Sequence, residues 1–162
     1  MDSNKHVFAV SVFMLVLLVG AVVGFSGGSE AQASDDMLTN DTITVYYSQT
    51  CGCCIDHANI LEDDGNDIRR IVQNQHQLGD IKENFGIPRE LASCHTMEIE
   101  DYIIEGHVPN EAIEKLLEEE PDIDGIALPD MPQGSPGMPG RKVEDFTIYQ
   151  FDDGDISEFM II

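Results

Sequence analysis

Hydrophobic positions along the chain fall into runs typical of strands and spacings typical of helices. The first run, Ile43 to Tyr47, is rich in β-branched and aromatic residues and predicts a strand. Directly after it, Cys54, Ala58 and Leu61 recur at helical spacing on one face. This spacing predicts a helix that begins near Cys53 or Cys54, so a strand-to-helix junction opens the predicted domain.

The same reasoning predicts a series of elements in the rest of the chain. The predicted strands are Asp67 to Val72, Thr96 to Ile99, Tyr102 to Glu105, Phe146 to Phe151 and Ile156 to Phe159. The predicted helices run from about Leu78 to Phe85 and from Pro109 or Asn110 to Pro121. The segment from Leu128 to Gly140 is rich in Pro, Gly and Met, and its composition predicts a loop rather than a helix or a central strand.

The order of these elements is β-α-β-α-β-β-α followed by a C-terminal hairpin. It is the order of an α/β fold of the thioredoxin-like type, in which a βαβ half is joined by a helix to a ββα half. In that plan the loop after the first strand faces the loop that leads into the third strand. We therefore predict a thioredoxin-like domain over residues 43–162, with these two loops side by side.

An apolar segment precedes this domain. Val7 to Phe25 carries no charged residue and is long enough to span a bilayer as a helix. Ala31-Gln32-Ala33 supplies a cleavage site of the small-x-small type, so residues 1–33 are predicted to be either a membrane anchor or a signal peptide, and residues 34–42 a linker. Lys5 is the only cation ahead of the apolar run, which predicts an extracytoplasmic domain, anchored in the membrane or secreted.

The chain is strongly acidic, with 31 Asp and Glu against 8 Lys and Arg and a net charge of −23. This balance excludes nucleic acid as a partner, because binding the phosphate backbone requires clusters of Lys and Arg. Acidic surfaces of this kind are typical of proteins adapted to high salt, where self-repulsion is screened. The charge therefore favours a halophilic source.

The four cysteines are unevenly distributed. Cys51, Cys53 and Cys54 fall within one short stretch at the predicted strand-to-helix junction, while Cys94 lies on the loop before the third strand. In an exported protein, paired structural disulfides are the default expectation. A disulfide between the adjacent Cys53 and Cys54 would be strained, however, so the cluster favours metal chelation or thiol chemistry over a structural disulfide. The thioredoxin-like plan places all four thiols together.

Two kinds of chemistry suit this arrangement. Cys51 and Cys54 form a CxxC pair at a helix N-terminus, where the helix dipole favours the thiolate that disulfide exchange requires. Cys53 and Cys94 are not needed for that reaction. Four convergent thiolates suit Cu(I), which selects soft sulfur ligands, and they also suit tetrahedral Zn.

Other side chains are candidates for the same site. His95 adjoins Cys94, and Met131 and Met138 offer thioether ligands if their loop folds over the cysteines. We interpret His57 and His107 as polar surface or turn residues. The sequence contains no Ser/His/Asp set, P-loop or dinucleotide fingerprint, so no catalytic residue is assigned.

Four residue runs, in this order, resemble the CopG-type copper-resistance proteins, a family long described as a domain of unknown function. They are Thr50-Cys51-Gly52-Cys53-Cys54, Leu91-Ala92-Ser93-Cys94-His95-Thr96, Ile104-Glu105-Gly106-His107-Val108-Pro109 and Met131-Pro132-Gln133-Gly134-Ser135-Pro136-Gly137-Met138. The resemblance covers about residues 43–160. It departs from the family where a tryptophan commonly follows the cysteine cluster, because Ile55-Asp56-His57 stands there and the chain has no Trp.

This resemblance implies a thioredoxin-like fold outside the cytoplasm, with copper bound by the thiolates of Cys51, Cys53, Cys54 and Cys94. It implies a role in copper resistance by sequestration, transfer or redox handling of copper. A copper-export ATPase or another exported copper protein is the expected partner besides copper itself. Two alternatives stay open: a thiol–disulfide oxidoreductase that uses Cys51 and Cys54, and a structural zinc or disulfide domain.

Overall fold

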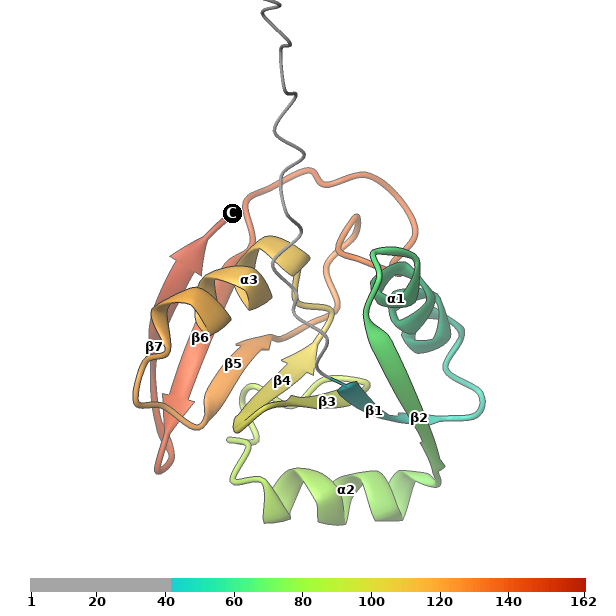
Figure 1. Cartoon of the computed structure of the whole chain (residues 1–162), viewed down its shortest axis with the longest axis horizontal. Coiled ribbons are helices and arrows are strands. Elements are labelled where there is room, and N and C mark those ends of the chain that lie inside the picture. The colour runs from blue at the N-terminus through green and yellow to red at the C-terminus, as the bar shows by residue number, and fades with distance from the viewer. Residues whose placement is uncertain (1–41) are drawn as a thin grey trace, which may run out of the picture. The chain divides into compact units, whose positions relative to one another are not determined.

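The structure is a computed structural model that describes residues 42–162. It contains one mixed sheet of seven strands in the order β2-β1-β3-β4-β5-β6-β7 (Figure 1). The strands are β1 (Thr42–Ser48), β2 (Asp67–Gln73), β3 (Thr96–Ile99), β4 (Tyr102–Gly106), β5 (Gly125–Leu128), β6 (Thr147–Asp152) and β7 (Asp155–Ile161). The helices are α1 (Gly52–Asp63), α2 (Gln75–Asn84) and α3 (Asn110–Glu119).

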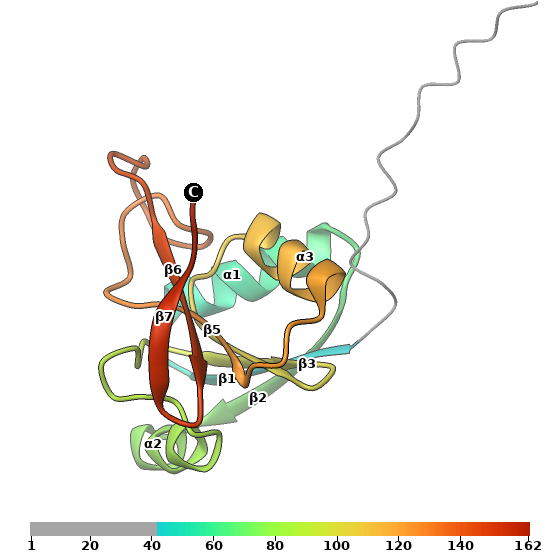
Figure 2. The same cartoon turned by 90° about the vertical axis from the view of Figure 1, so that its left-hand side faces the viewer.

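The helices cover both faces of the sheet. Helices α1 and α3 lie on one face and α2 lies on the other, as the two perpendicular views show (Figures 1 and 2). Strand β2 is parallel to β1, β3 is antiparallel to β1, and β4 is antiparallel to β3. This arrangement confirms the predicted thioredoxin-like plan with an additional C-terminal hairpin, which β6 and β7 form.

Strand β5 was not predicted. The interpretation of Leu128 as the start of a loop was wrong, because Leu128 ends this strand. All four residues of β5 are buried, so the sequence shows no alternation of apolar and polar positions there. Strand β5 is parallel to β4 and antiparallel to β6, and it thereby joins the hairpin to the rest of the sheet.

The main core lies between the sheet and the helices α1 and α3. Helix α1 contributes Cys54, Ala58 and Leu61, which are the apolar positions that predicted it. Helix α3 contributes Ala112, Ile113 and Leu116. Burying one face of each helix against the sheet fixes its position, because most helix stability in proteins comes from such packing.

The pairing of β1 with β3 determines where the cysteines meet. Tyr46, near the C-terminal end of β1, pairs with Thr96, the first residue of β3. The two strands are antiparallel, so the loop that follows β1 lies beside the loop that precedes β3. The first loop leads to Cys51 and the second carries Cys94.

The predicted leader, residues 1–33, and all but the last residue of the predicted linker lie outside the described residues. Among residues 42–162, no helix has the length and apolar character needed to cross a bilayer.

Candidate metal centre

The N-terminus of α1 carries three of the four cysteines. Cys51 is the N-cap residue, with extended backbone angles (φ −86°, ψ 90°), and Cys53 and Cys54 lie in the first turn. Cys54 faces the core and is fully buried, whereas Cys51 and Cys53 are half-buried. The sulfur atoms therefore lie where the unpaired amides and dipole of the helix favour thiolate.

Cys94 approaches this turn from the opposite loop. One ligand atom from each of Cys51, Cys53, Cys54 and Cys94 lies within 4.8 Å of all the others. The fold thus brings together the four cysteines that the sequence analysis singled out.

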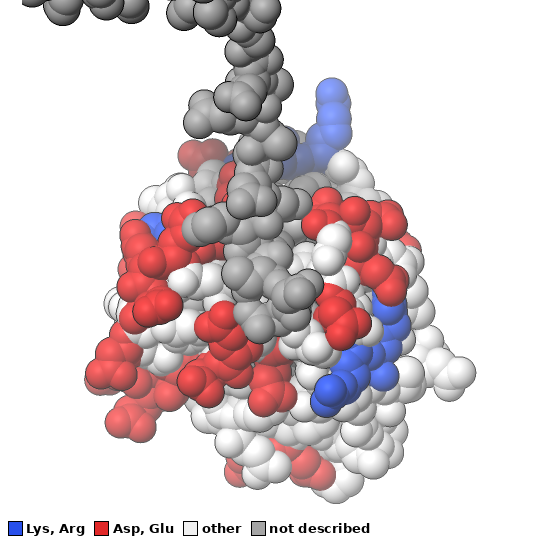
Figure 3. Space-filling model, in the orientation of Figure 1, with Lys and Arg blue, Asp and Glu red and all other residues white. Residues whose placement is uncertain are grey.

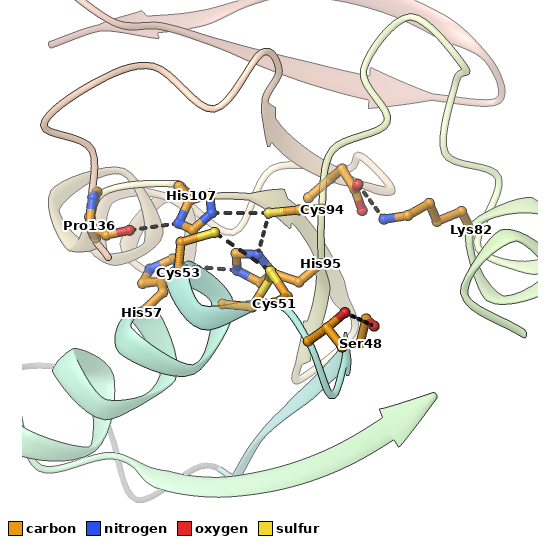
Figure 4. Close-up of a disulfide and its surroundings, with 12 residues drawn as sticks. Ser48, Cys51, Cys53, His57, Lys82, Cys94, His95, His107 and Pro136 are labelled. Atoms are coloured by element: carbon orange, nitrogen blue, oxygen red, sulfur yellow. Dashed lines mark hydrogen bonds and ion pairs between the residues drawn. A yellow bond between two sulfur atoms is a disulfide. The ribbon is translucent and has the colours of Figure 1, made fainter. Parts of the chain in front are cut away.

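Cys51 and Cys54 form a disulfide, and Cys53 and Cys94 are free (Figure 4). The Cys53 sulfur lies 3.5 Å from that of Cys51. In this oxidised state two of the four sulfurs are bonded to each other. Reducing the disulfide makes all four available as thiol or thiolate.

Three histidines pack around the Cys94 side of the cluster. His57, His95 and His107 are fully buried, with ring centroids 4.6 to 5.4 Å apart. The interpretation of His57 and His107 as surface or turn residues was therefore wrong. His57 follows Cys54 by three positions and shares the buried face of α1, and His107 follows the end of β4.

His107 is held in one tautomer. Its Nδ1–H donates to the carbonyl oxygen of Pro136 at 2.7 Å, which requires the proton on Nδ1. The unprotonated Nε2 then faces the Cys94 sulfur at 3.0 Å (Figure 4). A carbonyl that fixes the tautomer of an imidazole is the usual outer-shell arrangement of a metal-binding histidine.

His95 lies on the other side of the Cys94 sulfur. Its Nδ1 is 3.3 Å from Cys94 Sγ, and its Nε2 is 3.0 Å from His57 Nδ1. Ligand atoms of Cys54, Cys94, His95 and His107 also lie within 4.8 Å of one another. Two donor sets therefore overlap at Cys54 and Cys94, one of four sulfurs and one of two sulfurs with two imidazoles.

Burial keeps the donors near Cys94 uncharged in the metal-free protein. It raises the pKa of Cys94 to about 12, and the neighbouring Cys53 thiol contributes to this rise. Burial likewise lowers the pKa of His57 to about 3 and lowers the pKa of both His95 and His107. A cation that binds here would replace the Cys94 proton, because the thiolate is the ligand.

The loop of residues 129–140 that is rich in Met, Pro and Gly, called here the Met-Pro-Gly loop, approaches the site through its backbone. Gly137 has a positive φ of +78° and leaves no room for a Cβ, which would lie against the Cys53 carbonyl oxygen and 2.6 Å from the His57 amide nitrogen. This close approach brings the Pro136 carbonyl to His107. Met138 lines a depression beside Cys53, whereas Met131 is 41% exposed.

Fold and site together define a thioredoxin-like protein with a cysteine- and histidine-rich candidate metal centre. The family model for "Protein of unknown function, DUF411" matches residues 91–138, which contain Cys94, His95 and His107. Two solved structures of "Copper resistance protein copG", Form 2 and Form 1, are each 34% identical to the chain. They cover 75% of this chain and 98% and 96% of their own, with TM-scores of 0.68 and 0.67.

The chain belongs to the CopG family of copper resistance proteins, as its four sequence motifs indicated. No curated protein sequence is significantly similar to it.

Proposed function

We propose that the reduced protein binds copper as Cu(I) through Cys51, Cys53, Cys54 and Cys94, and that it serves in copper resistance by sequestering or transferring the ion. The observation that carries this proposal is the convergence of the four sulfurs within 4.8 Å. Cu(I) selects soft thiolate ligands and accepts few of them, so a compact group of sulfurs at a helix N-terminus suits it. The two similar structures are named as copper resistance proteins, and this supports copper as the metal.

The imidazoles extend this ligand set. In the proposal, His107 and His95 ligate on the Cys94 side, since each presents a ring nitrogen to the Cys94 sulfur within 3.3 Å. Zinc is the competing metal, because Cys54, Cys94, His95 and His107 form a set of two cysteines and two histidines. Cu(I) remains the better match, because two further sulfurs adjoin that set.

We further propose that residues 1–33 direct the domain out of the cytoplasm, as a cleaved signal or as an anchor. The apolar run Val7 to Phe25 and the small-x-small site support this proposal. A copper-export ATPase or another exported copper protein would then be the donor or the acceptor of copper. Cell fractionation and the N-terminal mass of the mature chain test the location and the cleavage.

A thiol–disulfide oxidoreductase is the second candidate function. The Cys51–Cys54 disulfide at the N-terminus of α1 favours it, because this is the arrangement that lowers a thiol pKa in CxxC oxidoreductases. That activity needs two thiols, whereas copper binding as proposed uses four. Cys53 therefore distinguishes the two functions.

The variant Cys53→Ser provides the test. If the protein binds copper as proposed, the variant binds fewer Cu(I) ions or binds them at least about tenfold more weakly, a loss of about 1.4 kcal/mol. Competition with a Cu(I) chelator under anaerobic conditions measures this. Unchanged copper binding together with full disulfide-reductase turnover in the wild type and the variant would favour the oxidoreductase instead.

A further inference from the structure

A buried ion pair lies next to the candidate metal centre, on the side away from α1. Glu105, in β4, is fully buried, and Lys82 of α2 has a side chain only 14% exposed. Lys82 Nζ donates to Glu105 Oε1 at 2.5 Å and to Thr96 Oγ1 at 2.9 Å. Figure 4 shows Lys82 reaching from α2 toward the loop that carries Cys94. A charged pair at this depth requires strong local partners, because desolvation of the two ions is costly.

The Glu105 carboxylate also contacts the cysteine loop on both sides of Cys94, through one backbone amide and one side-chain hydroxyl. The Ser93 amide donates to Glu105 Oε1 at 2.5 Å, and Thr96 Oγ1 donates to Oε2 at 2.6 Å. Cys94 lies between these two anchored residues. The carboxylate thus fixes the chain on both sides of the cysteine.

Gly106 and His107, the two residues that follow Glu105, also contact the cysteine loop. The Gly106 amide donates to the His95 carbonyl oxygen at 3.0 Å, and His107 Nε2 faces Cys94 Sγ. Gly106 has a φ of +83°, and a Cβ there would lie 2.5 Å from the Leu128 carbonyl oxygen and 2.9 Å from the Ser93 side chain. Contacts from residues 105–107 therefore fix the positions of residues 93–95.

We propose that Glu105 is a positioning residue for Cys94: its buried carboxylate, with Lys82 as the counter-ion, holds the Ser93 amide and the Thr96 hydroxyl so that the Cys94 sulfur meets the other ligands. The effect on copper affinity rests on the proposed function, whereas the effect on the loop does not. Glu105 is not itself assigned as a ligand, since both carboxylate oxygens already accept hydrogen bonds from protein groups. Helix α2 carries no cysteine, but in this proposal it helps to position the metal centre through Lys82.

The double variant Lys82→Met/Glu105→Leu tests the proposal. Removing one partner would leave a buried uncompensated charge, whereas replacing both ions with apolar side chains of similar size commonly preserves the fold. The control is Lys115→Met/Glu119→Leu, which removes a Lys–Glu pair from the surface of α3. Circular dichroism and thermal melting establish that both double variants are folded.

Two measurements on the metal-free, disulfide-containing protein report on Cys94 directly. One is hydrogen exchange of the Ser93 amide, and the other is alkylation of Cys94 relative to Cys53, the other free thiol. We expect the Ser93 amide to lose its protection and the Cys94 alkylation rate to rise about tenfold in the Lys82/Glu105 variant, because the loop then opens locally. The α3 control should keep wild-type rates at both cysteines.

Copper binding supplies the third measurement. We expect the Lys82/Glu105 variant to bind Cu(I) about 10- to 100-fold more weakly than the wild type, the usual effect of losing an outer-shell support. Unchanged Cys94 alkylation in the folded variant would overturn the positioning role. If the wild type binds copper, an equal copper affinity in the Lys82/Glu105 variant would overturn it as well. A wild type that binds no copper would contradict the proposed function, and Cys94 alkylation would then decide the positioning role alone.

Discussion

At the scale of single residues, the site combines potential metal ligands that are evident from the sequence with potential ligands that are not. Three cysteines in four positions are conspicuous, and the fold order was enough to place Cys94 beside them. The histidines gave a weaker signal. His57 shares the apolar face defined by Cys54, Ala58 and Leu61, and a polar residue on such a face could have been recognised as buried. No local pattern reveals that His107 meets a carbonyl 29 positions further along the chain.

The variant His107→Phe tests the role of this imidazole. We expect Cu(I) affinity to fall about tenfold or more, or about 1.4 kcal/mol, because a pre-oriented nitrogen beside Cys94 is lost while an aromatic ring still occupies the position. Competition with a Cu(I) chelator measures the change. His76→Phe is the matched control, since the His76 side chain on α2 is 90% exposed. Equal affinities in the wild type and the His107 variant would exclude His107 from the ligand set.

At the scale of elements, the predicted strands and helices were confirmed wherever their periodicity was clear. The exception, β5, is a four-residue strand buried on both faces, and only its neighbours in the sheet define it. Met131 and Met138 of the Met-Pro-Gly loop were candidates for thioether ligands. The contact that the structure shows is a backbone carbonyl, and side-chain patterns do not predict where a carbonyl points.

The variant Gly137→Ala tests whether the close approach of this loop to α1 constrains its sequence and stability. A Cβ at Gly137 would overlap the first turns of α1, so we expect the free energy of unfolding to fall by about 1–3 kcal/mol from overpacking, beyond the cost of the positive φ. Gly154→Ala is the matched control, because Gly154 also has a positive φ (+87°) but a Cβ there would have no neighbouring atom within 4 Å. Denaturant unfolding of both variants measures the difference. Equal losses would show that the close approach to α1 does not constrain the loop.

At the scale of the whole molecule, charge is the dominant feature. Acidic side chains cover much of the face seen in Figure 3, and few basic ones interrupt them. With a net charge of −23, repulsion between surface carboxylates opposes the compact state. The halophilic source inferred from this composition stays a prediction, as does the extracytoplasmic location.

Salt should therefore stabilise the protein. Raising KCl from 0.1 M to 1 M shortens the Debye length from about 10 Å to about 3 Å, so we expect the melting temperature to rise over this range. Differential scanning calorimetry of the domain measures this. A melting temperature that stays constant or falls would show that the acidic surface does not limit stability.

Anaerobic titration with Cu(I) tests the central claim most directly, with two forms of the protein compared: fully reduced, and with the Cys51–Cys54 disulfide intact. The account predicts that the reduced form binds copper and that all four thiols then resist a thiol reagent. It also predicts that the disulfide form binds fewer ions, because two of its sulfurs are bonded to each other. A reduced protein that binds no Cu(I), or whose four thiols stay freely reactive after loading, would contradict it.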